Sequence, residues 1–145
     1  MDQTASKAQH DYAVYLFQQG FYGDTVAQLD ELLRVEETGE RWSDWATAQF
    51  ALEHFAEAER GFRRALEMNP GMADAAVNFG MMLSSQGRCV EAVELFERAL
   101  PNLEGDARGT VQGFTAQCRA QLGEKSRKRS QPKARSKKRR PKARR

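Results

Sequence analysis

Residues 42–70 read WSDWATAQFALEHFAEAERGFRRALEMNP, and residues 76–104 read AVNFGMMLSSQGRCVEAVELFERALPNLE. When the first stretch is moved along the chain by 34 residues, it aligns with the second, and Phe62 falls on Phe96. Self-similarity at this period is typical of stacked helical hairpins. The stretch therefore predicts a binding or scaffolding module, but it does not name the partner.

Each of these units has two apolar patterns of helical period with a short break between them. Small residues recur where the two helices of a hairpin would cross: Ala46 and Gly80 in the front helices, Ala58 and Ala92 in the back helices. Helix axes approach to about 8–10 Å only where the crossing side chains are small. We therefore expect tight hairpins, with rings such as Phe62 packed between neighbouring hairpins.

The residues resemble the tetratricopeptide repeat family. One unit carries the family pattern as Trp42, Trp45-Ala46, Phe55, Ala58, Phe62, Ala65 and Pro70, and the next as Ala76, Phe79-Gly80, Gly87, Ala92, Phe96 and Ala99. The sequence departs from the pattern where Glu53 replaces the turn glycine, Gln49 a large apolar residue and Cys89 an aromatic residue. The later unit also lacks the closing proline in register, although Pro101 is close by. The resemblance implies an all-α fold, a right-handed α-solenoid.

The resemblance and the periodicity divide the chain into two parts. A repeat domain over residues 1–123 would hold three hairpins, at about 6–38, 39–72 and 73–105, and a capping helix over about 107–122. Asp106 is expected to cap that last helix, and Gly123 to follow its end. Residues 124–145 contain almost nothing apolar and many like charges, so we expect a disordered polybasic tail.

No catalytic motif is present, and the sequence predicts a non-enzymatic protein without cofactor or metal site. Cys89 and Cys118 lack metal-ligand spacing and are expected to be buried thiols in a reducing compartment, although a disulfide stays possible. Neither a signal peptide nor a membrane span is apparent, so a cytoplasmic location is expected.

The family resemblance implies a peptide-binding groove on the concave surface, lined by the front helices. By periodicity we expect the groove to present His10, Asp11, Val14, Phe17, Glu40, Asp44, Thr47, Phe50, Asp74, Asn78 and Met81. Asn78 matches an asparagine with which many peptide-binding members grip a peptide backbone. Acidic residues stand where carboxylate-clamping members have basic ones, so we expect a basic or mixed basic-apolar protein segment, and small-molecule ligands are not expected. The alternative is that the carboxylates are merely solvated and the rings fill gaps between repeats.

The net charge of +3 conceals two oppositely charged parts. Residues 1–124 hold 20 acidic and 10 basic residues, whereas residues 125–145 hold 13 basic and no acidic residues. The basic residues are Lys125, Arg127, Lys128, Arg129, Lys133, Arg135, Lys137, Lys138, Arg139, Arg140, Lys142, Arg144 and Arg145. They could bind nucleic acid without sequence readout, an acidic protein, an anionic membrane surface or the acidic body of the chain itself.

Three functions are compatible with the sequence. The chain could be an adaptor that binds a protein segment in its groove and a polyanion through its tail. It could be a nucleic-acid-associated protein in which the tail is the main binding element. It could also be the docking or regulatory subunit of a separate enzyme, such as a transferase.

Overall fold

The computed structural model describes residues 2–132, which form an all-α chain without strands. The helices are α1 (Gln3–Gln18), α2 (Tyr22–Val35), α3 (Gly39–Ala51), α4 (Phe55–Met68), α5 (Ala73–Ser85), α6 (Cys89–Ala99) and α7 (Gly105–Ser130), with a 3₁₀ turn η1 (Leu100–Asn102) before α7. The expected all-α fold is confirmed.

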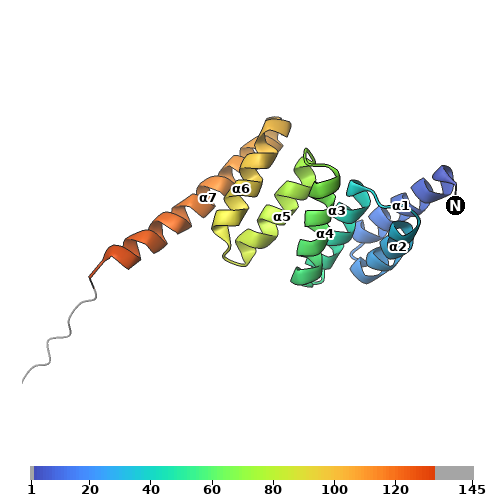
Figure 1. Ribbon diagram of the computed structural model, residues 1–145, viewed down its shortest axis with the longest axis horizontal. Helices are drawn as coiled ribbons and strands as arrows, with labels where there is room; N and C mark the ends of the chain where they lie inside the picture. Colours follow the sequence, from blue (N-terminus) through green and yellow to red (C-terminus); the bar gives the residue numbers. More distant parts are fainter. Residues whose placement is uncertain (1, 133–145) are drawn as a thin grey trace, which may run out of the picture.

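Consecutive helices pair into three hairpins, α1–α2, α3–α4 and α5–α6, which follow one another along a single row (Figure 1). Helix α2 packs on α3, α4 on α5, and α6 on α7, so each hairpin contacts the next one through its back helix. Helix α7 lies at the end of the row and continues beyond α6 (Figure 1). The result is an elongated helical stack with a shared core.

The three hairpins turn in the same way at positions that the sequence period relates. Gly20, Glu53 and Gly87 have φ values of 84°, 61° and 75°, in the left-handed region. In each turn an amide bonds back to a carbonyl five residues earlier, as from His54 to Gln49 at 2.9 Å. Glycine adopts this backbone without strain, whereas Glu53 does not. Glu53 therefore adopts the same turn geometry as the two glycines, but its backbone is strained.

Two glycines permit close helix approach within the hairpins. A Cβ atom on Gly80 would lie 2.6 Å from Cε1 of Phe96, and one on Gly61 would lie 2.8 Å from Cβ of Ala46. These distances are too short for real contacts, so α5–α6 and α3–α4 pack as tightly as they do because these side chains are absent. The sequence pattern predicted the close approach at Gly80 and missed the one at Gly61.

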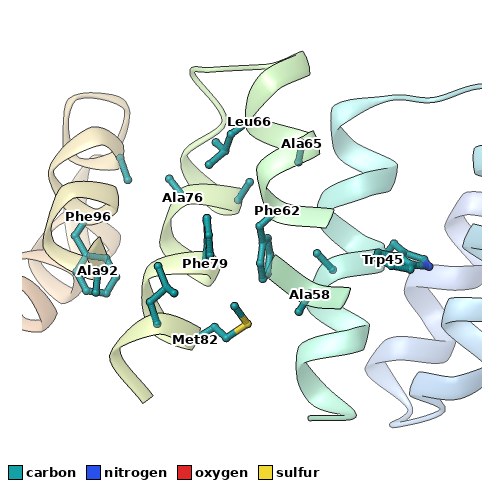
Figure 2. Packing of buried hydrophobic residues seen from close by; sticks show 14 of the residues in the cluster. Trp45, Ala58, Phe62, Ala65, Leu66, Ala76, Phe79, Met82, Ala92 and Phe96 are labelled. Carbon is teal, nitrogen blue, oxygen red and sulfur yellow. The ribbon is translucent and has the colours of Figure 1, made fainter. Parts of the chain in front are cut away.

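Rings fill the spaces between the later helices. Phe62 of α4 stacks on Phe79 of α5, with ring centroids 5.5 Å apart and an interplanar angle of 16° (Figure 2). Phe96 of α6 faces Phe114 of α7 at 5.8 Å. Both Phe62 and Phe96 are completely buried. The predicted position of Phe62 between neighbouring hairpins is confirmed, whereas Phe96 lies between the last hairpin and α7.

The contact between α6 and α7 also holds both cysteines. Cys89 and Cys118 are buried free thiols whose Sγ atoms lie 2.8 Å apart, so the predicted burial is confirmed. Burial, followed by the contact with Cys118, raises the pKa of the Cys89 thiol. A protonated, enclosed thiol is a poor nucleophile, which agrees with a packing role.

The termini of the helical stack differ from the sequence predictions. Helix α1 begins at Gln3 rather than near residue 6, because the Asp2 side chain accepts a hydrogen bond from the Ala5 amide and caps it. Helix α7 does not end near Leu122 but runs to Ser130, and Asp106 lies inside its first turn instead of capping it. Residues 124–130 are mostly strong helix formers, which favours continuation through Gly123. The rest of the predicted disordered tail, residues 133–145, lies outside the described residues.

Candidate functional site

The front helices and α7 together enclose an apolar groove of about 580 Å³. Its walls come from α1, α3, α5 and the start of α7. The lining residues are Val14, Phe17, Thr25, Ser43, Asp44, Thr47, Asp74, Val77, Asn78, Met81, Leu103, Ala107, Thr110, Val111 and Phe114. Val14 and Met81 are exposed although they are apolar, so the groove offers apolar surface to a ligand.

Seven of the eleven residues expected in the groove line this cavity. They are Val14, Phe17, Asp44, Thr47, Asp74, Asn78 and Met81. The other four were placed there by helical periodicity alone, which does not say how far along a helix a cavity extends.

Each of those four residues has a different position. Asp11 is exposed and accepts a hydrogen bond from Lys7 at 2.9 Å. Phe50 packs on Phe55 of its own hairpin, with ring centroids 6.2 Å apart. His10 bonds to a carboxylate of α3, and Glu40 lines a second, adjoining cavity. The cavity therefore covers a smaller part of α1 and α3 than the sequence predicts.

The sequence analysis missed the wall that α7 provides. Ala107, Thr110, Val111 and Phe114 follow one another at helical spacing and all reach the cavity. The sequence predicts only a capping helix over about 107–122 at this position. The only sequence signal for this wall is small residues next to an aromatic ring at helical spacing. The same pattern is also typical of a helix face that simply packs on its neighbour, so it does not indicate a groove.

A polar link crosses the floor of the groove. Asn78 donates a hydrogen bond from Nδ2 to Oγ1 of Thr47 at 3.4 Å, and Thr47 donates to the carbonyl of Ser43 at 2.8 Å. The link joins α5 to α3 and fixes the Asn78 amide. Among residues 2–132, no hydrogen bond reaches the Asn78 side-chain oxygen, so this oxygen can accept one from a peptide amide.

A histidine–carboxylate pair lies beside the groove. Nε2 of His10 is 2.6 Å from Oδ2 of Asp44, joining α1 to α3. The hydrogen bond that His10 donates to Asp44 raises the pKa of His10, against the opposing effect of burial. With Glu40, these residues place one nitrogen and two carboxylate ligand atoms within 4.8 Å of one another, a set that could hold a divalent cation. Exposed carboxylates of this kind also occur without an ion, and the hydrogen bond already accounts for the pair.

The predicted polyanion-binding residues fall into two groups. Lys125, Arg127, Lys128 and Arg129 lie on the exposed last turns of α7. The remaining nine, from Lys133 to Arg145, lie outside the described residues. Helix α7 thus presents four cations on a regular scaffold, whereas the sequence predicts a disordered tail from residue 124. No helix among residues 2–132 is long and apolar enough to cross a membrane.

Several solved structures share this fold. The Yersinia enterocolitica type III secretion translocator chaperone SycD superimposes with a TM-score of 0.78 at 12% identity, over 85% of this chain and 89% of that chain. The first tetratricopeptide repeat domain of Spaghetti (RPAP3), bound to an HSP90 peptide, gives 0.76 at 18% identity over 85% and 97%. The TPR2B domain of yeast Sti1 gives 0.74 at 17% identity over 82% and 99%. At these identities the likeness establishes the fold alone.

The sequence comparisons point the same way. No protein with a curated description matches the chain. The family model described as "Tetratricopeptide repeat" matches residues 43–107, which cover all but Trp42 of the two stretches related by the 34-residue period. Residues 43–107 of this chain therefore belong to the tetratricopeptide repeat family.

Proposed function

We propose that this chain is a non-enzymatic interaction scaffold that binds a segment of a protein partner in the groove between α1, α3, α5 and α7. The observation that carries the proposal is the groove itself, where apolar side chains such as Met81 and Val14 are exposed around the fixed amide of Asn78. Apolar surface supplies affinity and a few convergent polar groups orient the ligand.

Proteins of the same fold provide support from their own complexes. SycD has been solved with a peptide of the translocator YopD, and the RPAP3 domain with the HSP90 peptide SRMEEVD. Proteins of this fold can therefore bind a peptide. The present groove carries Asp44 and Asp74 and no lysine or arginine, so we do not expect it to bind an acidic peptide such as SRMEEVD.

Selection of peptides from a random displayed library on the full-length chain tests the proposal. We expect enriched peptides whose affinity falls at least about tenfold in Met81→Arg, because an arginine would fill apolar contact surface with a charge. Val90→Arg is the matched control, since Val90 is also exposed and apolar but lies on the back helix α6. Equal losses in both variants, or no enrichment at all, would contradict groove binding.

The basic end of α7 favours a second, additional role as a polyanion contact. Four exposed cations continue into a sequence with nine more and no acidic residue. A protein that makes roughly six to ten phosphate contacts loses about 10³–10⁵ in affinity between about 50 and 200 mM salt. We expect this steep dependence for random duplex DNA, and its loss when residues 131–145 are removed and the four α7 cations are replaced by glutamine. A cytoplasmic site of action is expected with either role.

A further inference from the structure

The apolar groove opens directly into a second cavity of different chemistry. This second cavity has a volume of about 370 Å³ and lies at the N-terminal ends of α3 and α5. Ser43, Asp44 and Asp74 line both cavities. A single bound segment could therefore occupy both at once, with neighbouring side chains in each.

The second cavity is acidic. Glu40 and Asp44 come from α3 and Asp74 comes from α5, and neither cavity is lined by lysine or arginine. Among residues 2–132, Glu40 and Asp74 form no ion pair. The two carboxylates are thus available to a cation from outside. We call Glu40, Asp44 and Asp74 the acidic subsite.

The nearby cations do not neutralise this subsite. His10 bonds to Asp44 at 2.6 Å and has its ring nitrogen within 4.8 Å of a Glu40 carboxylate oxygen, so one partial positive charge faces three carboxylates. Arg41 is adjacent in sequence to Glu40, but its side chain is buried and donates to the carbonyls of Glu36 at 2.7 Å and Leu32 at 3.3 Å. Lys7 bonds to Asp11. The local charges therefore leave a net negative field at the mouth of the cavity.

Helix stability accounts for only part of this arrangement. Glu40 and Asp74 lie in the first turns of α3 and α5, where a carboxylate favours the helix dipole. Asp44 lies one turn further along α3, beyond the reach of that effect. The convergence of all three on one cavity next to apolar surface needs another explanation, and charge complementarity to a partner supplies one.

We propose that the partner segment places a lysine or arginine in the acidic subsite and apolar side chains in the adjoining groove, a deepening that rests on the proposed function. The basic tail of the chain itself is a poor occupant, because residues 131–145 offer no apolar side chain larger than alanine or proline. A foreign segment that alternates basic and larger apolar residues satisfies both cavities.

Fluorescence anisotropy with three labelled twelve-residue peptides tests this inference on the full-length chain. The first peptide carries two leucines and a phenylalanine beside two lysines. The second has serines in place of the lysines, and the third has serines in place of the apolar residues. We expect the first to bind most tightly, and Asp74→Asn to weaken it about two- to fivefold without affecting the second, as for a partly exposed ion pair.

Asp24→Asn is the matched control. Asp24 is also an exposed carboxylate in the first turn of a helix, but it lies on the back helix α2 and lines neither cavity. Asp24→Asn removes the same charge as Asp74→Asn, and the same favourable interaction with a helix dipole. Because Asp24 lies outside both cavities, we expect it to leave all three affinities unchanged. Measurements with a chelator should give the same values, since the subsite acts through its own carboxylates.

The outcomes separate the two proposals. If none of the apolar peptides binds, or if Met81→Arg does not weaken them, the groove is not the binding site and both proposals fail. If both apolar peptides bind with equal affinity, or if Asp74→Asn and Asp24→Asn weaken the lysine peptide equally, the acidic subsite is refuted and groove binding stands. Loss of binding with the chelator would assign the acidic cluster to a metal ion instead.

Discussion

The two junctions between successive hairpins are built from different interactions. At the first junction, where α1 and α2 meet α3, Arg41 donates to backbone carbonyls and Trp45 donates to Asp30 at 2.8 Å. At the second, where α4 meets α5, the stacked rings of Phe62 and Phe79 make the central contact (Figure 2). The first junction has directed polar contacts at its centre, whereas the second has stacked rings there, with the Asn78–Thr47 hydrogen bond and the Arg88–Glu59 ion pair beside them. We call them the polar and the apolar junction after these central contacts.

The difference has consequences for both stability and function. Hydrogen bonds in a folded protein replace hydrogen bonds to water, so their net contribution to the free energy of folding is smaller than that of buried aromatic rings. Because hydrogen bonds are directional, they nevertheless fix the relative position of two helices. The polar junction also brings Asp44 and Glu40 to the end of the groove. We infer that the second junction supplies stability and that the first orients the two α3 carboxylates of the acidic subsite, Glu40 and Asp44.

Removing the central ring of the apolar junction should have the largest effect. Phe62→Ala leaves a cavity in fully buried surroundings and should lower the free energy of unfolding by about 3–5 kcal/mol, measured by urea denaturation. Phe21→Ala is the control, because that ring is mostly exposed and its loss should change stability by less than about 0.5 kcal/mol. Similar losses in the two variants would mean that the stacked rings are not central.

Breaking the polar junction should cost less. Arg41→Met keeps the apolar stem but leaves the carbonyls of Leu32 and Glu36 without the guanidinium, for an expected loss of about 1–3 kcal/mol. Arg34→Met, at an exposed position in the last turn of α2, should cost a few tenths of a kcal/mol. A loss for Arg41→Met as large as that of Phe62→Ala would remove the proposed distinction between the junctions.

The hairpin between the two junctions can be strengthened. Glu53 holds a left-handed backbone with φ 61°, so Glu53→Gly should raise the free energy of unfolding by up to about 1 kcal/mol. The reverse substitution in the next hairpin, Gly87→Glu at φ 75°, should lower it by about 1–2 kcal/mol. Thermal unfolding followed by circular dichroism measures both, and a decrease for Glu53→Gly would show that its side chain stabilises the turn.

Only the polar junction should respond to pH near neutrality. Since Asp44 raises the pKa of His10 above 6.5, their pair stabilises the fold fully below about pH 6.5, and the contribution is lost as pH rises through the raised value. The stability difference between the unmodified chain and His10→Gln should therefore shrink from about pH 5.5 to pH 9, by less than about 1 kcal/mol because solvent screens the pair. In an Asp44→Asn background the pH dependence of that difference should be absent.

The agreement between sequence and structure is best where neighbouring residues decide the conformation. Helix α2 spans Tyr22–Val35, within the first hairpin predicted at about 6–38, and Gly20 forms the turn before it. The C-terminal end of α7 could not be predicted from the neighbouring residues. Gly123 was a plausible stop signal, but the strong helix formers on both sides of it prevail.

The sequence by itself determined the repeated hairpins, the small residue at Gly80 and the rings beside it, because these depend on local propensity and on a period of 34 residues. Only the tertiary structure decided that α7 forms a wall of the groove, that Gly61 receives Ala46, and that Glu40, Asp44 and Asp74 meet at one cavity. Periodicity tells which residues share a face of one helix, whereas a cavity depends on how several helices are positioned relative to one another.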